Sequence, residues 1–402
     1  MRVLISTGTF PLREGDGLPA FVHALARHLG HLCEVSVLAP GAPGAPAHER
    51  WDDVEIERFS YFLPRSAQRL AYGSGMAPNL RRSWLARIQP PGFWYAQVRA
   101  LRRLLSRGRF DVVNSHWLVP QGLSAAWVRG VSGFPHVATV HGSDAYLLAR
   151  VRGGRRLASY VVDRSDSVIA VAGSVRDALD SALGRASGAE LLPMGVDLGR
   201  FKPGDEPEAR PFPAGYLLFV GRLAPNKGVA DLLQALPRVR AQHPGLGLVV
   251  VGGGVEAHAL RAQSASLGLS DAVRFEGAID QPGVARWLRG CRVAVLPSRR
   301  SRDSAEGQPV SMLEALASGA RVVATAIGGI PELLRHGENG WLCRDRDPAD
   351  LADKLLMALA DASASQVPRL ARESALPFAW PRVAARTHAI FAEVSARRAP
   401  EA

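Results

Sequence analysis

Hydrophobic residues along the chain alternate between short continuous runs and helically spaced positions. Residues 2–7 form an apolar run, and residues 19–29 carry Phe21, Leu25 and Leu29 at helical spacing. Further short apolar runs cover residues 34–39, 111–115, 136–141 and 167–172. Short apolar runs that alternate with helices are typical of strands buried on both faces of a parallel sheet. The first half therefore predicts a doubly wound α/β domain.

The same pattern restarts after residues 193–215, a segment rich in Pro and Gly that is typical of a linker. Strands are predicted at residues 217–220, 246–251, 273–276, 293–297 and 322–324, with helices at 228–240 and 380–398. We predict two Rossmann-like domains: residues 1–195 with a final helix at about 380–402 packed back on them, and residues 196–379. Ligands of such sheets bind beyond the carboxyl ends of the strands, so a cleft between the two domains is the expected site.

Composition agrees with a two-domain protein that has large cores. The chain has 402 residues, of which 47% are hydrophobic. Its three cysteines are far apart in the sequence and have no metal-binding spacing, which predicts a reducing compartment. The chain begins with a predicted strand and has no apolar run of membrane-spanning length. We therefore expect a cytoplasmic protein.

The net charge of +12 is concentrated in one segment. Residues 58–110 contain eleven Arg and no Asp or Glu, together with Trp84, Phe93, Trp94 and Tyr95. Arginines mixed with aromatic rings are typical of a surface that contacts anionic lipids or an anionic acceptor. A solvated, Arg-rich helical face is the alternative. No nucleic-acid-binding motif is present, so we expect no nucleic acid and instead a peripheral position on the inner face of a membrane.

A predicted phosphate-binding loop follows the strand at residues 217–220. It reads GRLAPNKG, and it places Arg222 and Lys227 just before a helix begins. Two cations beside a helix N-terminus form a site suited to a diphosphate. Lys227 is one of only three lysines in a chain that otherwise uses Arg, which indicates a need for a compact ammonium group there.

Two carboxylates lie eight positions apart in the stretch EGQPVSMLE, which runs from Glu306 to Glu314. Pro309 fits the first turn of a helix, because its missing N–H costs nothing there. Glu314 lies beside Leu313 and is expected to be partly buried. A buried carboxylate needs hydrogen-bond donors, and the 2′,3′-diol of a ribose offers two. We therefore predict Glu306 at the hydroxyls of a sugar and Glu314 at a ribose, with the diphosphate between them.

These stretches resemble those of glycosyltransferase family 4, also called glycosyl transferases group 1, which are retaining enzymes of the GT-B fold. The likeness rests on EGQPVSMLEALASGARVVAT, GGIPELL, GRLAPNKG and LLPMGVDLGRF, the last with Met194 where the family commonly has Asn. It covers nearly the whole chain. It is strongest between Leu217 and Cys343.

The resemblance implies a nucleotide-diphosphate sugar with its diphosphate on Arg222 and Lys227, its ribose on Glu314 and its sugar on Glu306. It implies that main-chain groups of Gly307, Gln308, Pro309 and Val310 meet sugar and phosphate oxygens. The base would lie at Gly277, Ala278 and Ile279. The implied reaction moves a sugar from a UDP- or GDP-sugar to a hydroxyl of a glycolipid, a lipid-linked oligosaccharide or a polysaccharide precursor. No metal or other cofactor is expected.

The predicted N-terminal domain contributes residues at the ends of its strands. His141 follows the strand at 136–141, and the family places a histidine there beside the donor sugar. His116 is a second candidate at a strand end, and Asp144 can either orient the site or cap the next helix. Gly17 belongs to a glycine loop expected to approach the diphosphate, although Asp16 interrupts its glycines.

Other readings of the sequence remain. GGGVEA at residues 252–257, with Glu276 after the next strand, matches a loose dinucleotide fingerprint and would indicate an NAD-dependent oxidoreductase. An epimerase, a hydrolase or a non-catalytic sugar-binding protein could use the same architecture. Asp345 and Asp347 mimic a metal-binding DxD, but Asp347 is better placed to cap a helix.

Overall fold

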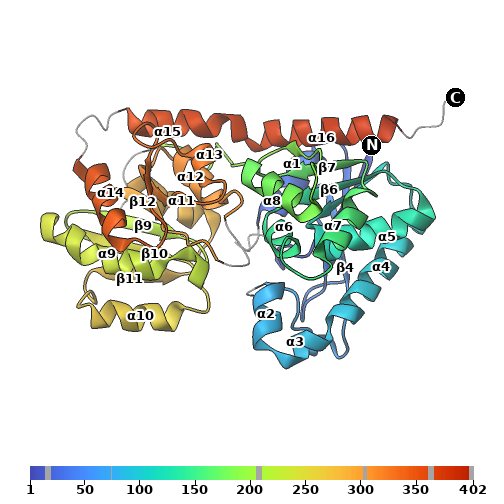
Figure 1. Ribbon diagram of the computed structural model, residues 1–402, viewed down its shortest axis with the longest axis horizontal. Helices are drawn as coiled ribbons and strands as arrows, with labels where there is room; N and C mark the ends of the chain where they lie inside the picture. The colour runs from blue at the N-terminus through green and yellow to red at the C-terminus, as the bar shows by residue number, and fades with distance from the viewer. Residues whose placement is uncertain (14–19, 74, 205–210, 302–305, 361–365, 398–402) are drawn as a thin grey trace. The chain divides into compact units, whose positions relative to one another are not determined.

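The computed structural model describes residues 1–13, 20–73, 75–204, 211–301, 306–360 and 366–397. The chain divides into two compact units, Met1–Pro193 with Trp380–Ala402 and Met194–Ala379 (Figure 1). Each unit is built on one sheet with helices packed against it. This confirms the prediction of two α/β domains.

The sheet of the first unit has eight strands in the order β3-β4-β2-β1-β5-β6-β7-β8. The strands are β1 (Arg2–Ser6), β2 (Glu34–Pro40), β3 (His48–Trp51), β4 (Val54–Phe59), β5 (Val112–His116), β6 (His136–Val140), β7 (Ser167–Ala170) and β8 (Glu190–Leu191). Among these strands every pair is parallel except β3 with β4. All residues of β5 and β6 are buried, which explains their continuous apolar runs.

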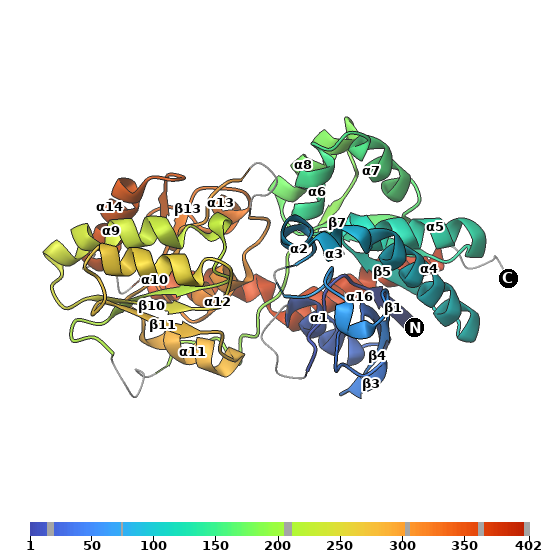
Figure 2. The same cartoon turned by 90° about the horizontal axis from the view of Figure 1, so that it is seen from below.

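The helices of the first unit lie between these strands in sequence, except for the last, which follows the second unit. They are α1 (Ala20–Gly30), α2 (Met76–Arg82), α3 (Trp84–Ile88), α4 (Pro90–Arg107), α5 (Leu123–Ser132), α6 (Ser143–Leu148), α7 (Gly154–Val162), α8 (Gly173–Leu183) and α16 (Trp380–Ala396), with short turns η1 (Arg65–Ala67) and η2 (Leu118–Gly122). The final helix α16 packs against α1 (Figures 1 and 2). The ring of Trp380 stacks on His28 with centroids 6.0 Å apart, and Arg386 Nε donates to Glu190 Oε1 at 2.7 Å.

The second unit has a six-stranded parallel sheet in the order β11-β10-β9-β12-β13-β14. Its strands are β9 (Tyr216–Val220), β10 (Gly247–Val251), β11 (Val273–Gly277), β12 (Val293–Leu296), β13 (Val322–Thr325) and β14 (Trp341–Cys343). Its helices are α9 (Val229–Gln242), α10 (Ala257–Ser266), α11 (Gln281–Gly290), α12 (Val310–Ala317), α13 (Ile330–Leu333), α14 (Pro348–Ala360) and α15 (Val367–Ala375), with short turns η3 (Pro225–Lys227) and η4 (Leu376–Phe378).

Alternate residues of the strands in this unit serve two separate cores. Leu217 of β9 packs with Leu232 of α9 on one face of the sheet. Its neighbour Leu218 packs with Leu288 of α11 and Leu313 of α12 on the other face. Both faces are therefore apolar, as expected for a doubly wound sheet.

The arginine-rich segment at residues 58–110 does not form a single exposed face. Arg58 is only 2% exposed, and it donates to Glu49 Oε1 at 2.9 Å and to Pro11 O at 2.7 Å. Phe93 lies in the core of the first unit. The expected anionic-surface contact therefore cannot include Arg58 or Phe93, whereas Trp84 and Tyr95 are exposed.

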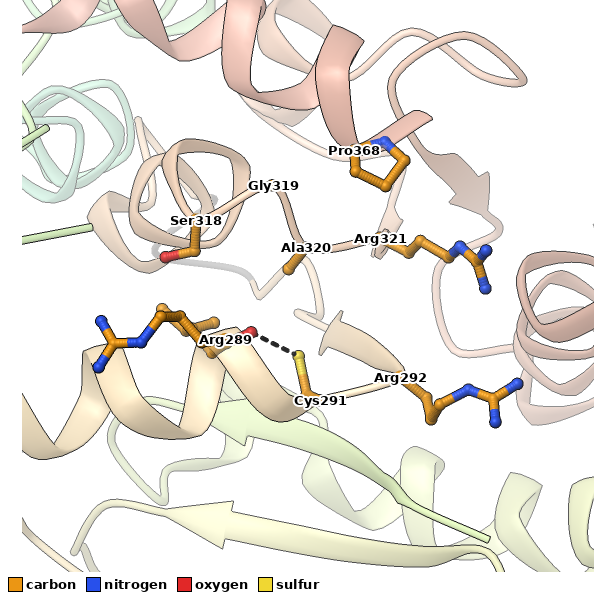
Figure 3. A pocket seen from close by; sticks show the side chains of 9 residues that line it. Arg289, Cys291, Arg292, Ser318, Gly319, Ala320, Arg321 and Pro368 are labelled. Carbon is orange, nitrogen blue, oxygen red and sulfur yellow. Dashed lines mark hydrogen bonds between the residues drawn. The ribbon is translucent and has the colours of Figure 1, made fainter. Parts of the chain in front are cut away.

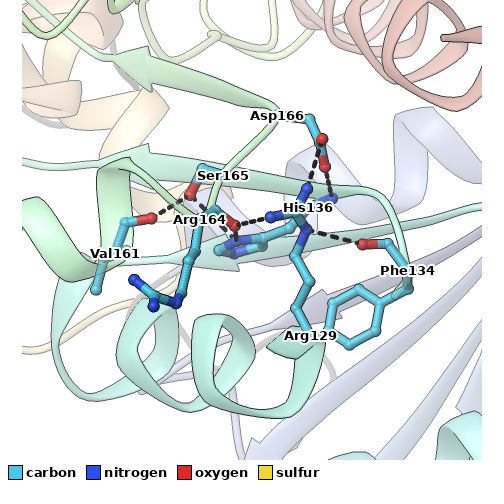
Figure 4. Close-up of polar contacts among 7 residues, drawn as sticks. All are labelled: Arg129, Phe134, His136, Val161, Arg164, Ser165 and Asp166. Atoms are coloured by element: carbon cyan, nitrogen blue, oxygen red, sulfur yellow. Dashed lines mark hydrogen bonds and ion pairs between the residues drawn. The ribbon is translucent and has the colours of Figure 1, made fainter. Parts of the chain in front are cut away.

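A buried polar network lies around His136, at the start of β6 (Figure 4). Ser165 donates its hydroxyl to Val161 O at 2.8 Å, so its oxygen accepts from His136 Nδ1–H at 3.1 Å. On the other side of the ring, Ser115 Oγ lies 2.9 Å from His136 Nε2. Asp166 accepts from the His136 backbone N–H at 2.8 Å. Burial lowers the pKa of His136 to about 4, so this histidine is neutral at neutral pH.

This network predicts a pH-dependent loss of stability. Below pH 6.5 the histidine of the unfolded chain binds a proton, whereas the folded chain resists protonation of His136 down to about pH 4. His136 alone should therefore lower the free energy of unfolding by about 3 kcal/mol as the pH drops from 6.5 to about 4. The slope of melting temperature against pH should be shallower in His136→Gln. The exposed His258→Gln is the control, and equal slopes in all three proteins would contradict the prediction.

Candidate active site

The loop with Arg222 and Lys227 follows β9 and leads into α9 through Gly228. Gly228 has φ +67°, and a Cβ there would lie 1.7 Å from Pro297 O. Only glycine therefore allows this loop to pack against the end of β12. The Lys227 N–H donates to Ala224 O at 2.8 Å, which closes the turn. This packing brings the Lys227 side chain towards the residues that follow β12.

Glu306 lies in the loop between β12 and α12 and contacts Lys227. Lys227 Nζ is 2.6 Å from Glu306 Oε1, and Ser298 Oγ donates to the same oxygen at 2.9 Å. Burial alone would raise the pKa of Glu306, but Lys227, Ser298 and Arg222 together lower it below its usual value. The structure therefore brings Arg222, Lys227 and Glu306 into one charged cluster. Ser298 was missed in the sequence, although it lies two residues after the end of β12.

Two glycines hold the backbone of Glu306 in place. Gly329 N–H donates to Glu306 O at 3.0 Å. A Cβ on Gly328 would lie 1.9 Å from the same oxygen, and Gly328 has φ +55°. The GGIPELL stretch therefore supports the loop that carries the acid, rather than adding a further side chain to the site.

Glu314 lies inside α12 and is 7% exposed. Gln281 Nε2, from the first turn of α11, donates to Glu314 Oε1 at 3.2 Å. Arg200 Nη1 in turn donates to Gln281 Oε1 at 3.2 Å. Burial raises the pKa of Glu314 to about 7, and Gln281 and Arg200 offset this only in part. Sequence reasoning missed Gln281 and Arg200, because both are far from Glu314 along the chain.

The segment before α12 differs slightly from the prediction. Pro309 was expected within the first helical turn, but the helix begins at Val310 and Pro309 is its N-cap residue. The side chain of Gln308 accepts from the Met194 backbone N–H, which orients the amide. Its Nε2 is buried and has no hydrogen-bond partner within the described part of the chain. Gly307 lies between Glu306 and this anchored residue.

Gly277, Ala278 and Ile279 follow from the end of β11 towards α11. Gly277 has φ +75°, and its carbonyl accepts from Gly252 N–H at 2.7 Å. Ile279 packs against the core of the second unit. These three residues therefore lie at the carboxyl edge of the sheet, where a base-binding role was predicted.

The GGGVEA stretch has a packing role in the structure. A Cβ on Gly252 would lie 1.9 Å from Gly221 O, and one on Gly254 would lie 2.3 Å from Leu223 O. The N–H of Leu223 donates to Gly253 O at 2.9 Å. The glycines are therefore required by the close approach of the neighbouring loop, which removes the reason to invoke a dinucleotide.

Residues of the first unit gather at the ends of β5 and β6. His116 Nδ1 and His141 Nε2 are 2.8 Å apart. Asp144, in the first turn of α6, accepts from the backbone N–H groups of Leu118 at 2.8 Å and Gly142 at 3.0 Å. Asp144 therefore links the loop after β5 with the loop after β6, and its partner in the second loop, Gly142, directly precedes α6. Gly17 lies outside the described residues.

A cavity of about 200 Å³ lies at the opposite edge of the second sheet, at the starts of β12 and β13 (Figure 3). Its lining includes Arg289, Arg292 and Arg321 but none of the predicted site residues. Asp347 Oδ1 accepts from Asp350 N–H at 2.9 Å, which confirms that Asp347 caps α14. Within the described part of the chain, no group of three or more His, Cys, Asp or Glu could hold a metal ion.

Comparisons with known proteins show the family to which this chain belongs. Residues 15–200 match the family model described as Glycosyltransferase Family 4, and residues 214–361 match Glycosyl transferases group 1. Glycogen synthase of Mycobacterium tuberculosis is 30% identical over 97% of this chain and 94% of its own length. The chain belongs to glycosyltransferase family 4. It is therefore a transferase that moves glycosyl groups.

One further relative and two solved structures are also similar to this glycosyltransferase. GDP-mannose-dependent alpha-(1-6)-phosphatidylinositol monomannoside mannosyltransferase of M. tuberculosis is 29% identical over 90% of this chain and 89% of its own length. Sucrose-phosphate synthase of Thermosynechococcus elongatus has a TM-score of 0.78 with 20% identity, covering 99% of this chain and 100% of that one. HepE of Anabaena in complex with UDP-glucose has a TM-score of 0.71 with 17% identity, covering 98% and 100%. These two structures confirm the GT-B fold.

Proposed function

We propose that this glycosyltransferase moves a sugar, with retention of configuration, from a UDP- or GDP-sugar to a hydroxyl of a glycan or lipid-linked acceptor. The observation that carries the proposal is the cluster of Arg222, Lys227 and Glu306, which α12 connects to the buried Glu314. Two cations and a helix N-terminus suit a diphosphate. Glu306 and Glu314 suit the hydroxyl groups of the sugar and of the ribose, which flank the diphosphate.

The cluster suits both a diphosphate and a sugar. Lys227 Nζ lies 2.6 Å from Glu306 Oε1 and helps to lower the pKa of that carboxyl, so both groups are charged. A bound diphosphate would accept hydrogen bonds from the ammonium group, while Glu306 would accept hydrogen bonds from sugar hydroxyls.

In the proposed reaction, the bond between the anomeric carbon and the diphosphate oxygen breaks, and its electron pair goes to the diphosphate. The sugar passes through an oxocarbenium-like ion pair. The acceptor oxygen then bonds to the same face of the anomeric carbon, and its proton goes to the leaving diphosphate. Arg222 and Lys227 stabilise the charge that develops on the diphosphate. His141 is proposed to contact the donor sugar.

The donor and acceptor classes have support from the relatives. HepE is recorded with UDP-glucose, and the mycobacterial mannosyltransferase is named for GDP-mannose and a phosphatidylinositol glycolipid. Glycogen synthase is named for a polysaccharide product. A panel of UDP-, GDP- and ADP-sugars in a thermal-shift assay should identify the donor, because a ligand that binds the folded state raises its melting temperature.

The decisive assay incubates the protein with that donor, with and without glycan or glycolipid acceptors, in the presence of EDTA. Acceptor-dependent transfer that withstands EDTA and gives the anomeric configuration of the donor is expected. Conversion of the donor alone would instead indicate an epimerase or a hydrolase. Binding of NADH, measured by its fluorescence, in preference to UDP or GDP would support an oxidoreductase.

An exposed patch of the first unit fits an anionic membrane surface. We define the α3 patch as the apolar side chains of Trp84 and Ile88, which are 73% and 54% exposed, while Leu63 and Tyr95 are further exposed apolar residues of the same unit. Trp84 and Ile88 are four residues apart on α3 and so share one face. Between residues 63 and 88 the exposed arginines are Arg65, Arg69, Arg81, Arg82 and Arg87. Within the described residues no helix is long and apolar enough to cross a bilayer.

The patch predicts lipid-dependent binding. Wild-type protein should float with vesicles that contain anionic phosphatidylglycerol and much less with neutral vesicles, because lipid charge attracts the arginines. The double variant Trp84→Ser with Ile88→Ser should lose most of this binding, whereas Met357→Ser, an exposed apolar residue of the second unit, should keep it. Equal flotation with neutral vesicles would contradict the role of the arginines, and no flotation with either kind of vesicle would argue for a soluble acceptor.

A further inference from the structure

The histidine pair at the strand ends has features that sugar binding alone does not explain. His116 is fully buried at the end of β5, and His141 directly follows β6. Their rings are stacked, with centroids 5.1 Å apart and planes inclined by 18°. His116 Nδ1 faces His141 Nε2 at a distance of 2.8 Å. A buried side chain that contacts a candidate catalytic residue in this way is a candidate for positioning it.

Both histidines are neutral at neutral pH. Burial lowers the pKa of His116 to about 3. Burial, together with the charge that His116 would carry if protonated, lowers the pKa of His141 well below its usual value. Two neutral rings at hydrogen-bond distance share a single proton between the facing nitrogens, so one ring donates and the other accepts. Which ring donates determines the nitrogen at which His141 carries its own proton.

The far side of the His116 ring indicates the direction of this bond. His116 Nε2 is buried and has no hydrogen-bond partner among the residues that the structure describes. If His116 accepted at Nδ1, its proton would sit on Nε2 as a buried N–H group without an acceptor. Buried N–H groups without an acceptor are rarer in folded proteins than acceptors that lack a donor. The arrangement with the proton on His116 Nδ1 therefore fits the structure better.

We propose that His116 is a positioning residue that donates from Nδ1 to His141 Nε2, so that His141 carries its own proton on Nδ1 as a hydrogen-bond donor. The role of this donor rests on the proposed function, in which His141 contacts the donor sugar. The His141 ring also contacts Trp117 and Phe21, with centroids 4.7 Å and 5.1 Å away, and these rings confine its orientation.

The backbone around the pair is organised for this contact. Trp117 follows His116 with φ +71°, a left-handed conformation that non-glycine residues adopt only when their surroundings impose it. Its N–H donates to Thr139 O at 2.8 Å, which aligns the ends of β5 and β6. Asp144 accepts from Leu118 N–H on one loop and from Gly142 N–H on the other. The two histidines are thus held at bonding distance by main-chain contacts as well as by their own bond.

The proposal is tested by long-range proton–nitrogen correlation NMR of the full chain labelled with ¹⁵N-histidine, with the His141 signals assigned by their loss in His141→Asn. In the wild type, His141 should show a protonated Nδ1 and an unprotonated Nε2. In His116→Phe, which keeps a ring but has no donor, the proton of His141 should move largely to Nε2. His136→Gln, which alters another buried histidine, should leave His141 unchanged.

A protonated Nε2 on His141 in the wild type, or the same tautomer in His116→Phe, would overturn the proposal. The wild-type spectrum alone decides this if His116→Phe does not fold. In the transfer assay, His116→Phe should lower kcat between about 10- and 100-fold with little change in the KM for the donor, because a misplaced ring affects the reacting state more than binding. The tautomer is measured without substrate, so its outcome is independent of whether the proposed transfer reaction is correct.

Discussion

Lys227→Ala is expected to lower kcat at least about 100-fold, the loss typical of removing one group that stabilises charge in a transition state. Lys227 lies 2.6 Å from Glu306 and belongs to the cluster that also contains Arg222. Without the ammonium group, charge that develops on the leaving diphosphate would be met by Arg222 and the α12 N-terminus alone. Initial rates at saturating donor measure the effect.

The substitution also leaves Glu306 without its cation. The pKa of Glu306 should then rise, because burial already favours the neutral acid and Lys227 is the main opposing group. Lys227→Arg tests whether any cation suffices; we expect poor rescue, since a planar guanidinium cannot occupy the position of a compact ammonium. Lys354→Ala, at another of the three lysines, is the matched control and should retain activity. Wild-type rates in Lys227→Ala would remove the lysine from the mechanism.

Glu314→Gln is expected to stabilise the ligand-free protein above pH 7 and to weaken donor binding. Burial raises the pKa of Glu314 from near 4.5 to about 7, so the unfolded chain loses this proton at a lower pH than the folded chain does. The stability that this group contributes is therefore present below pH 4.5 and is lost as the pH rises to about 7. The difference amounts to about 3 kcal/mol at neutral pH. Melting temperature against pH should fall less steeply over this window in Glu314→Gln than in the wild type.

Donor binding should lower the pKa of Glu314 and so remove the destabilisation that its burial causes. Two ribose hydroxyls that donate to the Glu314 carboxylate favour its charged form, so binding should release a proton at pH 6. Calorimetric titration in buffers of different ionisation enthalpy measures the number of protons released on binding. The difference in that number between wild type and Glu314→Gln gives the proton released by Glu314, because protons lost by the nucleotide are the same in both. We expect Glu314→Ala to lower transfer by about 100-fold or more, a loss comparable with that of a catalytic hydrogen-bond donor, because the ribose would lose its partner. Equal proton release in wild type and Glu314→Gln would show that the ribose does not bind here.

The sequence was sufficient for the parts of the fold that depend on local pattern. Strands such as β9 and β10 are buried on both faces, so their continuous apolar runs predict strands. The apolar residues of α9 recur at helical spacing, which predicts a helix. The β3–β4 hairpin was missed because β3 contributes only one buried residue, Trp51, and its polar positions show no alternation. The short edge strand β14 has only three residues, too few for any period to be visible.

The candidate site likewise contains residues that could be predicted from the sequence and residues that could not. Glu306 and Lys227 could be predicted because each belongs to a stretch with a turn, a charge and a helix start. Ser298, Gln281 and Arg200 could not be predicted, because they reach the site through tertiary contacts between distant segments. Arg58 was misjudged for the same reason: its neighbours along the chain indicate a surface, whereas Glu49 and Pro11 bind it in the interior.

The most direct test of the account is a crystal structure of the protein with the nucleoside diphosphate of its donor. Diphosphate oxygens are expected within hydrogen-bond distance of Lys227 Nζ and the Arg222 guanidinium, with both ribose hydroxyls on the Glu314 carboxylate. A nucleotide bound at the cavity beside Arg292 and Arg321, or with its ribose away from Glu314, would contradict it.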